Sequence, residues 1–160
     1  MNIDVLIASR GHPKELETSV RVMIALESGL HNIRYIIGMD EDDQKTIALT
    51  NEALRNTNTI ILPAPRPTCF GSVWNRCATF STAEYLMIMG DGPLCLTQSW
   101  DNWLPQLMNK DLMFSGLWAY APSLACFPVI TRQWYEATQT IMTEPLTIST
   151  SQGRLMFISG

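Results

Sequence analysis

The sequence is poor in charge, and in positive charge above all. Charged residues make up 16% of the 160 residues, against roughly 25% in typical globular domains. Fifteen acidic residues face eleven basic ones, which gives a formal net charge of −4, and only three of the basic residues are lysine. Proteins that neutralise many phosphates along a nucleic acid carry a basic surface. We therefore do not expect nucleic acid to be a partner.

A long hydrophobic run is also missing. A membrane helix needs about 20 consecutive apolar residues, whereas the apolar stretch at 85–89 has the length of a strand. The first residues, Met1 to Asp4, lack the basic region of a secretory signal. These features predict a cytoplasmic protein without a membrane span. Because 46% of the residues are apolar, there is material for one compact core, and we expect a single domain over residues 1–160.

Several common site motifs are absent. The four cysteines form no C-x-x-C pair and only two histidines accompany them, so a structural zinc site is not expected. The sequence contains no G-x-G-x-x-G, no G-x-x-x-x-G-K-[ST], no H-E-x-x-H and no G-x-S-x-G. This argues against dinucleotide-binding, P-loop, zinc-protease and serine-hydrolase chemistry.

Apolar runs of strand length alternate with helical patterns. Strands are predicted at 5–8, 35–39, 59–62, 85–89, 112–118 and 125–130, and helices at 13–29, 42–55, 70–77, 100–108 and 131–142. Pro13 suits a first helical position, and Asp42 or Asp43 can cap the second helix. Residues 146–148 and 155–158 flank a turn and predict a small C-terminal hairpin.

This alternation predicts an α/β fold with three layers, α/β/α, around a mostly parallel central sheet. Ligands of such sheets bind beyond the carboxyl ends of the strands. The loops at those ends contain Arg10, the acidic run 40–43 and Asp91. A carboxylate placed there can hold a divalent cation, and an arginine can meet a phosphate. The acids could equally cap helices and solvate the loops.

Taken in order, these segments resemble the nucleotide-sugar glycosyltransferases of the GT-A fold, most closely those of the family-2 type. The resemblance spans residues 3–137 and is carried by 5–13, 38–43, 74–75, 83–92 and 100–101. It implies a nucleotide-binding half at 1–92 and a shortened acceptor half at 93–160. The nucleotide-binding residues that it implies are Ala8, Ser9, Arg10, Asp40, Asp42 and Asn75.

The family's metal-binding D-x-D element corresponds here to Gly90-Asp91-Gly92. The resemblance implies that Asp91 binds Mn²⁺ or Mg²⁺ on the diphosphate of the sugar donor. Gly92 stands where the family has a second carboxylate, which leaves Asp91 as the only acid of the element. One carboxylate, the donor's diphosphate and water molecules can still hold Mg²⁺.

The resemblance therefore implies a glycosyltransferase that moves a sugar from a nucleotide-diphosphate sugar to an acceptor hydroxyl with the help of a divalent cation. Asp91 would hold the cation, and Asp101 or Glu144 would be the general base. Asp101 could instead cap a helix, because it follows Trp100 at a predicted helix start.

Two other functions remain open. One is a catalytically inactive GT-A-like module that binds a nucleotide or a protein. Nine methionines and five tryptophans would suit a surface for a protein partner or a second copy of the chain. The other is a nucleotidyltransferase, which the missing glycine-rich triphosphate loop disfavours.

Overall fold

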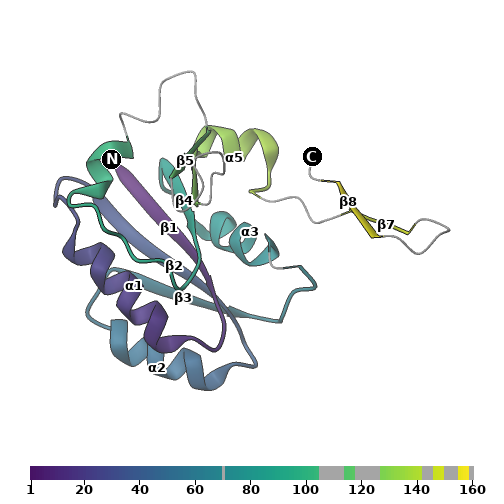
Figure 1. Cartoon of the computed structure of the whole chain (residues 1–160), viewed down its shortest axis with the longest axis horizontal. Coiled ribbons are helices and arrows are strands. Elements are labelled where there is room, and N and C mark those ends of the chain that lie inside the picture. The colour runs from purple at the N-terminus through teal and green to yellow at the C-terminus, as the bar shows by residue number, and fades with distance from the viewer. Residues whose placement is uncertain (70, 105–113, 118–126, 142–145, 150–154, 159–160) are drawn as a thin grey trace.

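The computed structural model describes residues 1–69, 71–104, 114–117, 127–141, 146–149 and 155–158. Its main sheet has six strands in the order β3-β2-β1-β4-β6-β5 (Figure 1). The elements are β1 (Asn2–Ser9), α1 (Pro13–Ala25), β2 (Asn32–Asp40), α2 (Gln44–Leu54), β3 (Thr59–Ala64), α3 (Gly71–Phe80), β4 (Tyr85–Met89), the 3₁₀ helix η1 (Trp100–Trp103), β5 (Phe114–Leu117), β6 (Phe127–Thr131), α5 (Arg132–Thr138), β7 (Leu146–Ser149) and β8 (Leu155–Ile158).

The sheet is parallel over its first four strands. β1 pairs in parallel with β2 and β4, and β2 pairs in parallel with β3. β6 then runs antiparallel to β4, and β5 antiparallel to β6. The predicted α/β fold with a mostly parallel sheet is confirmed. β7 and β8 pair antiparallel as a separate two-stranded sheet, which confirms the C-terminal hairpin.

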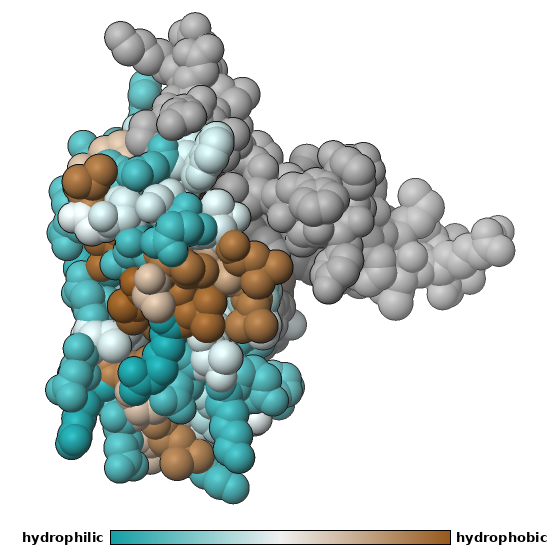
Figure 2. All heavy atoms as spheres, turned by 60° about the vertical axis from the view of Figure 1, so that its left-hand side comes forward, coloured by the Kyte–Doolittle hydropathy of each residue, from teal (hydrophilic) through white to brown (hydrophobic). Residues whose placement is uncertain are grey.

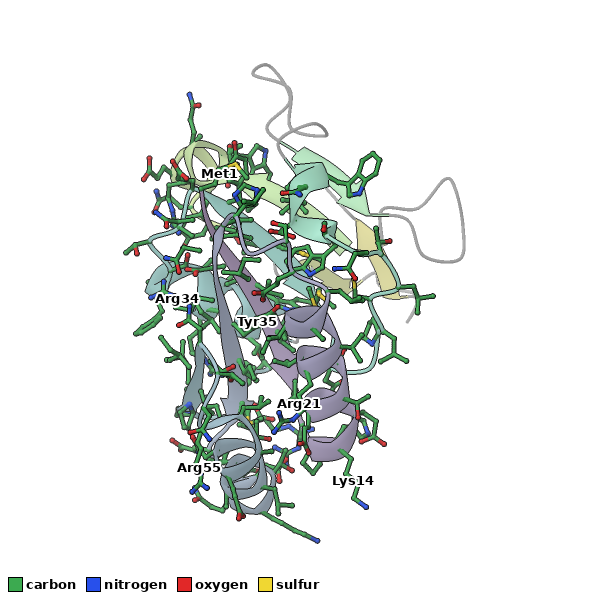
Figure 3. The ribbon with its side chains drawn as sticks, turned by 90° about the vertical axis from the view of Figure 1, so that its left-hand side faces the viewer. Met1, Lys14, Arg21, Arg34, Tyr35 and Arg55 are labelled. Carbon is green, nitrogen blue, oxygen red and sulfur yellow. The ribbon has the colours of Figure 1, made fainter. Side chains whose placement is uncertain are left out.

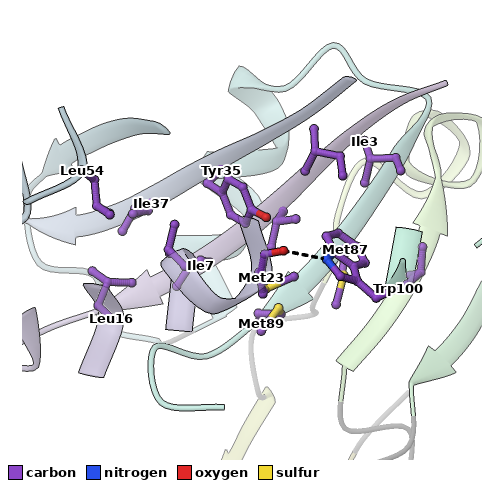
Figure 4. Close-up of a cluster of buried hydrophobic side chains, with 14 of the residues drawn as sticks. Ile3, Ile7, Leu16, Met23, Tyr35, Ile37, Leu54, Met87, Met89 and Trp100 are labelled. Atoms are coloured by element: carbon purple, nitrogen blue, oxygen red, sulfur yellow. Dashed lines mark hydrogen bonds between the residues drawn. The ribbon is translucent and has the colours of Figure 1, made fainter. Parts of the chain in front are cut away.

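Hydrophobic cores fill both faces of the sheet, because successive residues of a strand point to opposite sides. Val5 and Ile7 pack with Leu16 and Val20 of α1 on one face, part of which is shown in Figure 4. Leu6 packs with Cys77 of α3 on the other face, in a cluster that also contains Tyr135 of α5. The three predicted layers are thus present.

The layer on the first face is held together at two points. α1 and α2 lie side by side, and Arg21 of α1 donates from Nη2 to the carbonyl oxygen of Ala53 at 2.6 Å (Figure 3). Two residues further along α1, the indole Nε1 of Trp100 donates to the carbonyl oxygen of Met23 at 3.1 Å (Figure 4). Trp100 is 6% exposed and belongs to the core.

Some predicted details were wrong. β3 continues to Ala64 instead of ending at Leu62, because β3 is an edge strand and tolerates Pro63, which lacks a backbone N–H. On α2, Ala48 is exposed although its side chain is apolar. The buried face of α2 is formed by Thr46, Thr50 and Leu54, which are spaced four residues apart.

The amino ends of β1 and β2 are joined by an ion pair between buried Asp4 and partly buried Arg34. Asp4 and Arg34 are register partners, and Arg34 donates from Nε and Nη2 to the two carboxylate oxygens of Asp4, at 2.9 and 2.6 Å. Ser81 also donates to Asp4, and Arg132 donates to Ser81. The hydrogen bond with Asp4 raises the pKa of Arg34.

Crossing a bilayer takes a helix of about 20 largely apolar residues. Within the described part of the chain, none of the helices is long and apolar enough to do so.

Candidate functional site

A pocket of about 320 Å³ lies at the carboxyl ends of β1, β2 and β3. The residues that line it are Ala8, Ser9, Arg10, Asp40, Arg66, Pro67, Thr68 and Val73. Parallel strands that end at the same edge bring their following loops together. The fold therefore gathers four of the residues predicted to bind a nucleotide: Ala8, Ser9, Arg10 and Asp40.

Arg10 joins the loop after β1 to the loop after β2. Its Nη1 donates to Asp40 Oδ2 at 2.7 Å and to Asp42 Oδ1 at 2.5 Å, and its Nη2 donates to Asp42 Oδ2 at 3.0 Å. The hydrogen bonds with Asp42 and then Asp40 raise the pKa of Arg10, and the bond from Arg10 lowers the pKa of Asp42. Both carboxylates thus face a group that stays charged.

Asp43 makes a second connection between these loops. Its Oδ1 accepts a hydrogen bond from the backbone of Thr46 at 3.4 Å and caps α2, while Oδ2 accepts one from the backbone of Gly11 at 2.7 Å. Gly11 has φ +75°, a left-handed conformation that favours glycine. Burial alone would raise the pKa of Asp43, but these hydrogen bonds outweigh burial and lower it. The predicted cap of α2 is confirmed for Asp43.

α3 approaches the end of β2 closely enough to form one wall of the pocket. A Cβ atom added to Gly38 would lie 2.5 Å from Val73 Cγ1 and 2.9 Å from Cys77 Sγ. Cys77 is a buried free thiol, and burial raises its pKa to about 12. Arg76 donates from Nη2 to the carbonyl oxygen of Met39 at 3.1 Å. The glycine therefore permits the contact that places Val73 in the pocket wall.

Asp91 lies beside the pocket, just after β4. Its Oδ2 accepts a hydrogen bond from Ser9 Oγ at 2.8 Å and lies 3.3 Å from His12 Nδ1. Trp74 on α3 donates from Nε1 to the carbonyl oxygen of Met89 at 2.9 Å, which fixes the end of β4. Through Ser9, Asp91 is connected directly to the pocket lining.

The donor atoms around Asp91 allow a test of the predicted cation site. Within the described residues, no group of three or more His, Cys, Asp and Glu side chains could by itself hold a metal ion. The carboxylate of Asp91 with the hydroxyl of Ser9 is an oxygen donor set of the kind that Mg²⁺ and Mn²⁺ prefer. These residues fit a divalent cation if a bound diphosphate and water supply the remaining ligands.

Asp101, one of the two predicted general bases, is not at this edge. Asp101 is 0% exposed, and its carboxylate accepts hydrogen bonds from the backbone and hydroxyl of Ser28, just beyond α1. α1 has 13 residues and is about 20 Å long at 1.5 Å per residue, so Asp101 lies at the end of this helix remote from His12. The geometry favours a structural role. Asn75 Oδ1 accepts a hydrogen bond from the backbone of Ile141, and Glu144 lies outside the described residues.

The pocket residues of the loop after β3 were not predicted from the sequence. Arg66, Pro67 and Thr68 line the pocket, and Arg66 Nε lies 3.9 Å from Asp40 Oδ2. Ligands of parallel sheets bind beyond the carboxyl ends of the strands, and this applies to the loop after β3 as it does to the loops after the other strands. The two prolines of this loop, Pro65 and Pro67, indicate only a stiff connection.

The predicted partner surface can be compared with the exposed side chains. Met23, Met39, Met87 and Met89 are buried, so these methionines contribute to the core. Large exposed hydrophobic residues in the described part include Leu94, Leu96 and Trp103, and Figure 2 shows hydrophobic side chains gathered in the middle of one face. A protein partner or a second copy of the chain stays a prediction.

Comparison with known proteins gives a structural likeness. No protein-family model and no curated protein sequence matches the chain. A mannosyltransferase, PcManGT from Pyrobaculum calidifontis in complex with GDP-Man and Mn²⁺, matches with a TM-score of 0.72 at 8% identity, over 86% of this chain and 46% of that one. S. aureus TarS with UDP-GlcNAc matches with a TM-score of 0.70 at 8% identity, over 95% and 51%.

A third solved structure extends this set. Glucosyl-3-phosphoglycerate synthase from Mycobacterium tuberculosis, with Mn²⁺, UDP and phosphoglyceric acid, matches with a TM-score of 0.63 at 10% identity, over 82% of this chain and 56% of that one. The chain therefore spans about half the length of these solved structures. At such identities the likeness shows a shared fold.

Proposed function

From the premise that the chain has the GT-A fold of nucleotide-sugar glycosyltransferases, we propose that it binds a nucleotide-diphosphate sugar and transfers the sugar to an acceptor hydroxyl. The observation that carries the proposal is the pocket at the carboxyl edge. There Arg10, Asp40 and Ser9 meet, and Ser9 connects the pocket to Asp91. We place this activity in the cytoplasm.

In this proposal the loops after β1 and β2 hold the nucleoside. The carboxylate of Asp40 is 10% exposed and borders the pocket, where it can accept hydrogen bonds from the N–H groups of a base. Asp42 and Arg10 fix the orientation of that carboxylate through their shared contacts. Ala8 and Ser9 lie along the nucleotide. Asn75, on α3, supports the nucleotide loop from outside the pocket lining.

Asp91, oriented by Ser9, holds the divalent cation on the diphosphate. A bound Mn²⁺ or Mg²⁺ neutralises the charge that gathers on the departing nucleoside diphosphate. The Mn²⁺ complexes of two of the structural neighbours support this assignment. Ser9 adds a hydroxyl 2.8 Å from the same carboxylate.

The acceptor half of the proposal rests on residues 93–160. An inverting transfer needs a carboxylate that removes the proton of the acceptor hydroxyl. Glu144 is our proposed base. Asp101 is no longer a candidate, because its carboxylate is buried and bonded to Ser28.

The alternative, a catalytically inactive GT-A-like module for binding a nucleotide or a protein, is favoured by one observation. Asp91 Oδ2 already accepts a hydrogen bond from Ser9 and lies within hydrogen-bonding distance of His12. A carboxylate engaged in this way can serve to fix loops rather than to bind a cation.

Calorimetric titration with UDP, GDP and their sugar conjugates, with and without Mn²⁺, separates these functions. We expect nucleotide binding that Asp40→Asn weakens at least tenfold, and Mn²⁺-dependent binding that Asp91→Ala abolishes. Glu41→Gln, a change at the exposed acid next to Asp40, is the matched control and should bind as the unmodified protein does. Binding that is independent of Mn²⁺, without sugar transfer, would select the inactive module. No binding of any nucleotide would contradict the transferase and the nucleotide-binding module, and would leave a module that binds a protein.

A further inference from the structure

His12 occupies a restricted position at the start of α1. It is the N-cap residue, but its side chain makes no capping hydrogen bond. The Pro13 that follows restricts the backbone of His12, and Asp43 holds the backbone N–H of Gly11 before it. The imidazole is therefore presented from a fixed backbone, with 63% of the side chain exposed, and its Nδ1 lies 3.3 Å from Asp91 Oδ2.

This separation has the value expected for two neighbouring ligands of one cation. Oxygen and nitrogen ligands lie about 2.1 Å from Mg²⁺ or from first-row divalent metals. Adjacent ligands are then about 3.0 Å apart in an octahedral site and about 3.4 Å apart in a tetrahedral one. The 3.3 Å between His12 Nδ1 and Asp91 Oδ2 falls within this range.

The chain also has room for such a ligand. Gly92 leaves the element after β4 with one carboxylate, so another protein donor would strengthen a cation site there. A Cβ atom added at Gly92 would meet nothing within 4 Å. His12 approaches Asp91 from the loop after β1, on the same side as Ser9.

We propose that His12 is a further protein ligand of the cation site, binding through its imidazole nitrogen beside Asp91. This inference rests on the proposed function, in which Asp91 holds the cation on a nucleoside diphosphate. His12, Asp91 and the hydroxyl of Ser9 leave the other coordination positions to the diphosphate oxygens and water. The cation and the nucleotide therefore increase each other's affinity.

An imidazole ligand also changes which cation the site prefers. Mg²⁺ prefers oxygen ligands, whereas imidazole suits first-row transition metals, whose affinity for a nitrogen-containing site exceeds that of Mg²⁺. The site should therefore bind Mn²⁺ at least tenfold more tightly than Mg²⁺ in the presence of GDP or UDP. Replacement of the imidazole by a carboxylate should reduce that preference.

The test measures metal binding and does not depend on turnover. Mn²⁺ and Mg²⁺ are titrated into the full chain, with saturating GDP or UDP, and the Mn²⁺ complex is examined by electron spin-echo spectroscopy for coupling to an imidazole ¹⁴N nucleus. We expect this coupling in the unmodified protein and its loss in His12→Ala, with at least tenfold weaker Mn²⁺ binding. His12→Asp should restore binding and bring the Mg²⁺ affinity close to that for Mn²⁺.

Glu15→Gln, at an exposed acid in the first turn of α1, controls for a general change of charge near the site and should leave both metal affinities unchanged. If Mn²⁺ binding depends on Asp91 but His12→Ala alters neither the affinity nor the spectrum, the role of His12 is disproved and the proposed function stands. If neither nucleotide nor metal binds to the unmodified protein, the proposed function is disproved and this inference with it.

Discussion

The two ends of the β1–β2 pair each carry an aspartate–arginine cluster, and the clusters differ in what surrounds them. At the amino end, the Asp4 side chain is 3% exposed and that of Arg34 is 26% exposed. At the carboxyl end, the side chain of Arg10 is 37% exposed and that of Asp42 is 56% exposed. Asp40 of the second cluster also borders a pocket.

This difference separates a structural cluster from a binding cluster of similar composition. Ser81 and Arg132 complete the hydrogen bonding around Asp4, so the amino-end cluster has little left to offer a ligand. The carboxyl-end cluster keeps charge and hydrogen-bonding capacity at an open pocket. Changes at the amino end should therefore affect folding, and changes at the carboxyl end should affect binding.

The largest effect is expected from Asp4→Ala. The substitution leaves the Arg34 guanidinium without its carboxylate in a largely buried position, and breaking a buried pair in this way costs about 3 kcal/mol of stability. Urea unfolding followed by circular dichroism measures it. A loss as small as that caused by Asp42→Ala would show that the two clusters do not differ as we infer.

A smaller effect is expected from Gly38→Ala, at the carboxyl half of β2. The added methyl group would lie within 3 Å of Val73 and Cys77, so α3 must shift, and overpacking of this kind costs about 1–3 kcal/mol. Because Val73 lines the pocket, nucleotide affinity should fall as well.

Gly92→Ala is the matched control for Gly38→Ala, since its Cβ would meet nothing within 4 Å. Its midpoint of urea unfolding should stay close to that of the unmodified protein. If the two alanine variants unfold at the same urea concentration, the close approach of α3 to Gly38 does not prevent a larger side chain there.

Arg10→Gln should change binding more than stability. The ion pair of Arg10 with Asp42 joins exposed groups and contributes little to folding, so the unfolding midpoint should fall far less than in Asp4→Ala. Nucleotide affinity should fall about tenfold, because Asp40 and Asp42 lose the Arg10 guanidinium that orients their carboxylates. A clear loss of stability together with unchanged affinity would reverse the roles of the two ends.

The smallest effect concerns pH. Glu27, beyond α1, accepts a hydrogen bond from Tyr35, yet burial raises its pKa above the ordinary value of 4.5. The unfolded chain loses this proton first, so stability falls as the pH rises from 4.5 towards the raised pKa. Arg10 lowers the pKa of Asp42, whose contribution is present above its ordinary value of 3.8 and is lost as the pH falls below it.

Glu27→Gln keeps an oxygen that can accept from Tyr35 and removes the charge. Thermal unfolding between pH 4 and 7 should show a flatter profile for this variant than for the unmodified protein. Asp42→Asn should instead flatten the profile below pH 4. Identical profiles for all three proteins would show that neither group contributes to the pH dependence.

Local sequence pattern was sufficient for most strands and for the first part of the site. The apolar run 85–89 predicted β4 with its observed bounds, because polar and glycine residues delimit it. Arg10 and Asp40 were predicted from the rule that strand-end loops converge, and they do meet.

Features that depend on tertiary packing could not be predicted from the local sequence pattern. α5 ends at Thr138, earlier than predicted. The next residue, Gln139, has a left-handed φ of 58°, and a glutamine in the sequence does not indicate that conformation. Asp101 looked like a candidate base, and only the packing of η1 beside the end of α1 shows that it bonds to Ser28. The fit of Gly38 against α3 likewise needs the positions of both elements.

The hydrogen bond from Trp74 to the carbonyl oxygen of Met89 gives the protein an internal optical reporter. Asp91 is only two residues beyond that carbonyl, so an ion captured by its carboxylate would alter the electric field at the indole. The emission of Trp74 should respond to such capture, and Trp74→Phe would identify its share of the signal among the five tryptophans. Occupancy of the loop after β4 could thus be followed by light, without any added label.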